Sequence, residues 1–221
     1  MSACMVISFC CLMRRCEIFV TAANHYLRGQ DVIFGVSVNG IEKDIYPRDA
    51  YKYDLSACCN SAITVHSAKN DWTGEGHRMF FTARDPEAVA LGFDLVLVMF
   101  AWAQRARPRN DDAFLTYNKG KEFISYTEVS KVIKEVAQEF GFAPVHYHMH
   151  SLRVGGASTL AAAGHPSHYI QKMGRWKSLA FLQYIHWAVS GMADALRTLS
   201  NPKVFTAAHI KRINPAAVLQ S

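Results

Sequence analysis

The feature that most constrains the fold is the regular spacing of helix-ending and helix-starting residues along residues 150–187. This stretch is HSLRVGGASTLAAAGHPSHYIQKMGRWKSLAFLQYIHW. Gly164 and Gly174 are typical helix ends, Pro166 is typical of a first helical turn, and Ser178 is a favourable N-terminal cap. The pattern therefore predicts three short consecutive helices, the first beginning near the start of the stretch and the last continuing past its cap.

The upstream part predicts further helices and one β-hairpin. The runs AITVHSA (62–68) and HRMFFTA (77–83) are typical of strands, and KNDWTGEG (69–76) between them predicts a hairpin with a long tip. Residues 30–60 are ambiguous. Helices are expected at 3–28 with a break near Arg14, at about 87–104, and at 125–140 with Gly141 as its end. We expect a single domain over residues 1–221, mainly α with a small antiparallel β-sheet (α+β).

Composition excludes several classes of protein. Apolar residues make up 50% of the chain, which argues against a disordered or fibrous protein. The six cysteines have the spacing of neither a zinc site nor a disulfide framework, so we expect buried free thiols. The apolar run at 88–103 carries Asp94 and is interpreted as a buried helix rather than a membrane span. The N-terminal run lacks the charged start of a signal peptide.

Positive charge is concentrated in the last third of the chain. Residues 146–221 hold 8 Lys or Arg and 1 Asp or Glu, whereas the whole chain has a net charge of +6. A basic segment of this kind indicates a surface for a polyanion, with nucleic acid as the first candidate. A solvated basic face without a partner is the alternative.

The same segment holds the candidate chemistry. His150 and Arg153 are three residues apart at an expected helix start, so they share one face; a guanidinium matches a phosphate and an imidazole can exchange a proton. A helix-capping histidine beside a surface arginine remains the alternative. The pair Gly155–Gly156 indicates close backbone approach, either of a neighbouring helix or of a ligand. Tyr184 alone would be interpreted as a core residue.

The order of these motifs resembles the tyrosine recombinases, the phage-integrase family. Arg14–x–x–Glu17 comes first, then Lys69 at the expected hairpin tip, then His–x–x–Arg, Gly–Arg–Trp and the tyrosine. The resemblance covers about residues 8–190. Within the family, SAKNDWTGEG, HSLRVGGAS and GRWKSLAFLQYI are most similar to the branch carried by eukaryotic mobile elements, such as cryptons and DIRS-like retroelements.

The resemblance implies site-specific cleavage and rejoining of double-stranded DNA, with the family's catalytic fold and with no cofactor or metal. It implies that Tyr184 attacks the scissile phosphate to form a 3′-phosphotyrosyl link, that Arg14 and Arg153 hold the non-bridging oxygens, that Lys69 protonates the leaving 5′-oxygen, and that His150 assists proton transfer. Family members usually act as homo-tetramers on two duplexes. The mobile-element branch implies a nuclear location.

The chain departs from the family pattern in two places. The position after the glycine, nine residues before the tyrosine, is usually His or Trp but here is Arg175, followed by Trp176; we favour Trp176 for that role. The family also has a DNA-clamping domain before its first arginine, and only 13 residues precede Arg14. We therefore expect that domain to be absent, which leaves a catalytically silent DNA-binding relic as one alternative.

Two other chemistries remain open. A type IB topoisomerase shares the tyrosine chemistry but relaxes DNA. His146, His148 and His150 would lie on one face of an extended segment, where a metal site is conceivable.

The segment SGMADALRTL (190–199) is a candidate helix for contact with a neighbouring subunit.

Overall fold

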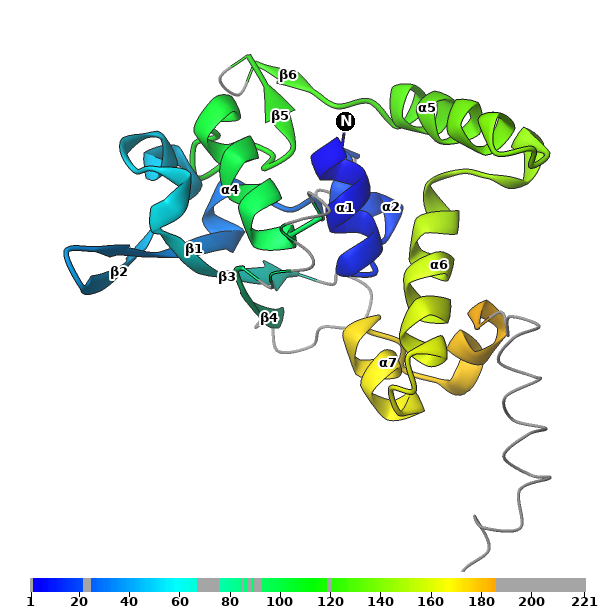
Figure 1. Ribbon diagram of the computed structural model, residues 1–221. Helices are drawn as coiled ribbons and strands as arrows, with labels where there is room; N and C mark the ends of the chain where they lie inside the picture. The colour runs from blue at the N-terminus through cyan, green and yellow to red at the C-terminus, as the bar shows by residue number, and fades with distance from the viewer. Residues whose placement is uncertain are drawn as a thin grey trace, which may run out of the picture.

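The computed structural model describes residues 2–21, 25–66, 76–84, 86, 89, 93–118 and 121–185. The described helices are α1 (Ser2–Cys10), α2 (Arg15–Ile18), α4 (Leu95–Ala106), α5 (Tyr126–Glu139), α6 (Met149–Ala162) and α7 (Ser167–Met173). Short 3-10 helices occupy Gly29–Asp31, Pro47–Lys52, Leu55–Ala57, Pro144–His146 and Leu179–Tyr184. The strands are β1 (Val32–Val38), β2 (Ile41–Ile45), β3 (Cys58–Val65), β4 (His77–Thr82), β5 (Thr116–Tyr117) and β6 (Glu122–Phe123). The expected mainly helical α+β class is confirmed (Figure 1).

Four strands form one antiparallel sheet in the order β2-β1-β3-β4. Asn39 and Gly40 join β1 to β2, both with positive φ (53° and 78°), as a tight hairpin turn of this type requires. The pairing of β3 with β4 confirms the two predicted strands, in a register that places Ile63 opposite Met79, although β3 begins at Cys58, earlier than predicted. Residues 67–75, which include most of the predicted hairpin tip, lie outside the described residues. Strands β1 and β2 lie in the stretch 30–60, for which the sequence supports no clear prediction. Strand β2 is exposed for most of its length and three of its five residues are charged, so it lacks the apolar alternation of a typical strand.

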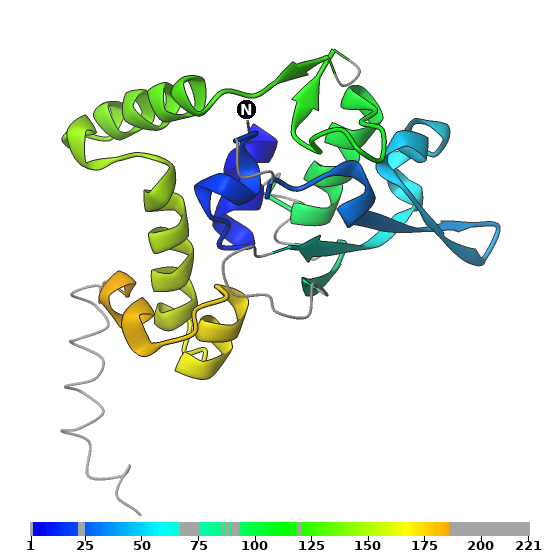
Figure 2. The ribbon, with the colours of Figure 1, turned by 180° about the vertical axis from the view of Figure 1, so that it is seen from behind.

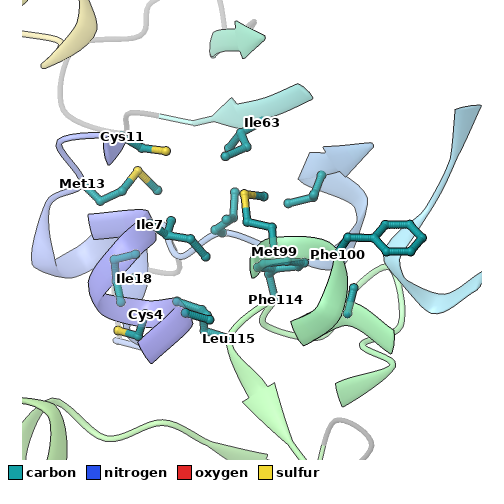
Figure 3. Close-up of a cluster of buried hydrophobic side chains, with 14 of the residues drawn as sticks. Cys4, Ile7, Cys11, Met13, Ile18, Ile63, Met99, Phe100, Phe114 and Leu115 are labelled. Carbon is teal, nitrogen blue, oxygen red and sulfur yellow. The ribbon is translucent and has the colours of Figure 1, made fainter. Parts of the chain in front are cut away.

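Helix α4 packs against strand β3 of the sheet and against α1, and the main core includes side chains from all three. The rings of Phe34 on β1 and Phe100 on α4 meet edge to face at 5.1 Å. Figure 3 shows Ile7 of α1 and Met99 of α4 in this cluster, beside Ile63 of β3.

All six cysteines are free thiols. Cys4, Cys11 and Cys58 are buried, and the other three are half-buried. Burial raises the pKa of the Cys4 thiol to about 12, so it behaves as an apolar core group.

Two helix boundaries differ from the sequence prediction. Helix α4 begins at Leu95 because the buried carboxylate of Asp94 caps it, accepting a hydrogen bond from the Leu97 amide at 2.9 Å. The predicted helix at 3–28 is also wrong at residues 19–21 and 25–28, the described residues beyond α2. There the Leu27 amide bonds to the Glu17 carbonyl, and the Leu27 carbonyl accepts from the Phe114 amide, so the backbone pairs with another segment.

Helix α6 packs directly against α1, which lies between α6 and α4 (Figures 1 and 2). A Cβ atom at Gly156 would lie 2.4 Å from the Phe9 carbonyl oxygen, so only glycine permits this approach. A Cβ at Gly155 would lie 3.4 Å from the Phe9 ring, an ordinary contact. The glycine pair therefore serves helix packing at Gly156, one of the two explanations that the sequence left open.

The helices after α4 follow their sequence signals. Ser125 and Glu128 cap α5 reciprocally, and Gly141 (φ 78°) ends it with a hydrogen bond from the Phe142 amide back to the Ala137 carbonyl. Pro166 and Gly174 bound α7, as predicted. None of the helices among the described residues is long and apolar enough to cross a membrane.

Candidate active site

The turn that follows α7 brings the candidate residues together. Gly174 ends the helix, and Arg175 adopts a left-handed backbone conformation with φ 57°, which only a few non-glycine residues adopt. A Cβ atom at Gly174 would lie 1.6 Å from Cζ3 of Trp176. The indole therefore covers the Gly174 backbone, and any side chain at this position would displace it. We call residues 174–176 the arginine turn.

Arg175 holds the arginine turn against the loop between α1 and α2. Its side chain is 5% exposed and its Nη2 lies 2.6 Å from Oε2 of Glu17, which is 2% exposed. The same guanidinium donates to the carbonyls of Cys11 (3.1 Å), Leu12 (3.0 Å) and Met173 (2.9 Å). These contacts make Arg175 a structural link between the segment Cys11–Glu17 and the turn after α7, which are distant in sequence.

The surroundings of Glu17 favour its ionised form. Burial alone would raise the pKa of the carboxyl, but the charge and hydrogen bond of Arg175, and then the contacts from Arg14, outweigh it, and the net pKa lies below the usual range. Glu17 is therefore a carboxylate that holds two arginines. The Arg–x–x–Glu spacing was visible in the sequence, but the second partner, 158 residues away, was not.

Arg14 reaches the same turn from the start of α2. Its Nη1 lies 2.8 Å from Oε1 of Glu17, and its Nη2 donates to the Arg175 carbonyl at 2.7 Å. The Arg14 side chain remains 32% exposed. Glu17 thus orients a guanidinium that still reaches solvent at the edge of the turn.

Arg153 approaches the arginine turn from α6. It is 3% exposed, donates to the carbonyls of Leu12 and of Gly174 (2.5 Å), and places its guanidinium carbon 4.2 Å from the centre of the Trp176 ring. Arg14 and Arg153, far apart in sequence, therefore bond to consecutive carbonyls of one turn. The sequence did not indicate that Arg153 would be buried.

His150 lies in the first turn of α6, as predicted, on the exposed part of the helix. Partial burial, and then the positive charges of Arg153 and His148, lower the pKa of His150, which favours the neutral imidazole at neutral pH. The histidine segment is not extended, because Pro144–His146 forms a 3-10 helix and α6 follows, so the three histidines do not share an extended face. Within the described part of the chain, no three His, Cys, Asp or Glu side chains are grouped to hold a metal ion.

The backbone of Tyr184 ends the 3-10 helix Leu179–Tyr184, eight residues after Trp176. This segment is anchored by Phe181, which is fully buried in a second cluster with Leu12 and whose ring centre is 5.7 Å from that of Trp176. The predicted third helix therefore exists as a 3-10 helix over this range. The side chain of Tyr184, all of Lys69 and the segment 190–199 lie outside the described residues.

The arrangement is a set of fixed positive charges next to a tyrosine-bearing segment. Arg14, Arg153 and Trp176 meet at one turn, with His150 at the start of the helix that carries Arg153. Fixed cations of this kind can stabilise negative charge that develops on a phosphate. Of the two residues considered for the position after the glycine, Arg175 is held by Glu17, whereas the indole of Trp176 faces Arg153.

The fold is that of a tyrosine recombinase catalytic core. The XerH site-specific recombinase, solved in a post-cleavage complex with a palindromic difH substrate, superposes with a TM-score of 0.52 at 15% sequence identity. The match covers 90% of this chain and 45% of the XerH chain, so this chain spans less than half the length of that protein. A search of curated proteins finds no match.

The family follows from the sequence of the second half of the chain. Residues 77–189, slightly more than half of the 221 residues, match the phage integrase family. The protein therefore belongs to the phage integrase family, as the resemblance indicated.

Proposed function

We propose that this protein cleaves and rejoins double-stranded DNA at specific sites through a covalent link to Tyr184. The observation that carries the proposal is the convergence of Arg14 and Arg153 on consecutive carbonyls of the arginine turn, shortly before the tyrosine in sequence. Family membership and the tyrosine recombinase fold support the same chemistry.

In the proposed first step, the hydroxyl oxygen of Tyr184 attacks the scissile phosphorus, and its proton passes to a base, either water or the neutral imidazole of His150. A bond from phosphorus to the tyrosine oxygen forms while the bond to the 5′-oxygen breaks, and Lys69 gives a proton to that leaving oxygen. His150, as a neutral imidazole, can accept or return a proton at the phosphate. A free 5′-hydroxyl then attacks the phosphotyrosyl link in the reverse reaction and rejoins a strand.

The arginines supply the electrostatic part of this proposal. The two carbonyl contacts of Arg153 fix its charge before substrate arrives, and Glu17 orients Arg14, which is partly exposed to solvent. Such preorganised charge stabilises the extra negative charge of the transition state without reorganisation during the reaction. Because the covalent link conserves the phosphodiester, the strand can be rejoined without an external energy source.

The sequence motifs support proposals for the branch of the family, the oligomeric state and the cellular compartment. The Gly–Arg–Trp motif in the turn, with HSLRVGGAS before it, supports membership of the mobile-element branch of cryptons and DIRS-like retroelements. A homo-tetramer acting on two duplexes, in a nuclear compartment of a eukaryotic cell, is the assembly that fits this branch.

Covalent trapping tests the proposal. Purified protein is incubated with a pool of nicked duplex oligonucleotides, denatured in detergent and separated on a gel. We expect a shifted adduct that Tyr184→Phe abolishes and that Tyr51→Phe, a change at an exposed tyrosine on another element, leaves intact.

Two other outcomes would replace the proposal. Salt-sensitive DNA retention without an adduct in any variant would establish the DNA-binding relic instead. An adduct accompanied by relaxation of supercoiled DNA, but never by strand exchange between two duplexes, would establish topoisomerase-like activity.

A further inference from the structure

A groove runs between the edge strand β4 and helix α7, outside the arginine turn. Its volume is about 240 Å³, and its walls include Arg78 and Phe80 of β4 and Tyr169 and Lys172 of α7. Strand β4 is the last strand of the described sheet, so this groove follows the sheet edge. The volume is below the roughly 300 Å³ at which pockets for complete small ligands begin, so the groove suits one part of a longer molecule.

The groove combines exposed aromatic rings with positive charge. Phe80 is 71% exposed and Tyr169 is 44% exposed, so both rings are accessible to a partner. Arg78 lies over the Phe80 ring at 4.9 Å, and the Tyr169 ring stacks on His165 at 5.2 Å, so each ring has a neighbour that can stack on it. None of the described residues that line the groove is acidic. The surface therefore complements a partner that is both planar and anionic.

The groove adjoins the candidate active site through shared residues. Met79 and Met173 line it, and the Arg175 guanidinium contacts the sulfur of Met79 at 3.9 Å and the Met173 carbonyl at 2.9 Å. His77, also in the wall, has a lowered pKa because of its burial and then the charges of Arg175 and Lys172. A neutral imidazole there can donate or accept a hydrogen bond at the edge of a base.

We propose that this groove binds an unpaired nucleotide of a DNA strand, with the base against Phe80 and Tyr169 and the phosphates near Arg78 and Lys172. The inference rests on the proposed function, since cleavage of a duplex leaves a strand end that can separate from its complement. Bases stack on aromatic side chains regardless of sequence, and basic residues follow the backbone. A duplex keeps its bases stacked on each other and cannot offer one to Phe80.

Direct binding measurements test the groove. The probe is a fluorescein-labelled single-stranded thymidine oligonucleotide of about ten nucleotides, a length typical for such sites, compared with a duplex of equal length. Phe80→Ala should weaken single-strand binding about fivefold or more, the effect of losing one base–aromatic stack, and should leave duplex binding unchanged. Phe80→Trp should retain single-strand binding. Phe140→Ala, at a phenylalanine that is 74% exposed on another element, is the matched control and should change neither.

Three results would overturn the groove as a site for an unpaired nucleotide. The first is equal single-strand affinity of the Phe80→Ala and Phe140→Ala variants. The second is an equal loss of single-strand and duplex binding in Phe80→Ala, which would indicate a general DNA surface. The third is a Phe80-dependent site that a glutamate-rich peptide occupies more tightly than the oligonucleotide does.

The adduct assay on the same proteins separates the two proposals. An adduct without Phe80-dependent single-strand binding overturns the groove and leaves the proposed function. Phe80-dependent single-strand binding without an adduct overturns strand cleavage and leaves the groove as a nucleotide site.

Discussion

Replacing Glu17 by glutamine should destabilise the whole protein, because it removes the anion that holds a buried arginine. Glu17 and Arg175 are 2% and 5% exposed and their charged atoms are 2.6 Å apart. Removing one partner of a buried pair typically costs about 3–5 kcal/mol, out of a total stability of about 5–15 kcal/mol. The three carbonyl contacts of Arg175 remain, which places the expected loss near the lower end, at about 3 kcal/mol.

Urea unfolding at several pH values measures this effect. The pKa of Glu17 is lowered in the folded state, so its contribution is complete above the ordinary glutamate pKa of about 4.3 and is lost as the pH falls through the folded value. The deficit of Glu17→Gln relative to the native protein should therefore shrink in acid. Asp49→Asn, which breaks an exposed pair with Lys52, is the matched control and should have little effect. A deficit that is absent at neutral pH, or that does not change with pH, would refute the reasoning.

Two further predictions concern the close approach of backbone and side chains at glycines. Gly156→Ala should cost about 1–3 kcal/mol in thermal unfolding, because the new Cβ would lie 2.4 Å from the Phe9 carbonyl oxygen, whereas Gly155→Ala should be neutral or stabilise by up to about 1 kcal/mol through helix propensity. Equal effects of the two changes would contradict the proposed packing of α6 on α1. Gly174→Ala should displace the Trp176 ring and so change tryptophan fluorescence in the folded state; an unchanged spectrum would show that the indole does not cover this position.

The helical part of the fold was predictable where local signals decide the structure. Ser125 with Glu128, Gly141, Pro166 and Gly174 each begin or end a helix as their chemistry indicates. The start of α4 was predicted several residues too early, because the apolar run at 88–103 was interpreted as one helix, whereas Asp94 within that run caps α4.

The sheet and the site depend on partners that are distant in sequence. β2 pairs with β1 although its residues are mostly polar and exposed, because it is an edge strand whose side chains contribute little to the core. The motifs indicated Arg14 and Arg153 as a pair, but burial of Arg153 and the ion pair of Arg175 with Glu17 arise only when the loop after α1 meets the turn after α7. No local pattern encodes such a contact.

The most direct test of strand cleavage is to locate the covalent bond. Adducts formed on nicked duplex DNA would be digested with nuclease and protease, and the modified peptide sequenced by tandem mass spectrometry, while the released DNA end is assayed for labelling by a kinase specific for 5′-hydroxyls. We expect a nucleotide on the Tyr184 side chain and a free 5′-hydroxyl on the released strand. A nucleotide on another residue, or a released 5′-phosphate, would contradict the mechanism in which Tyr184 attacks and the 5′-oxygen leaves.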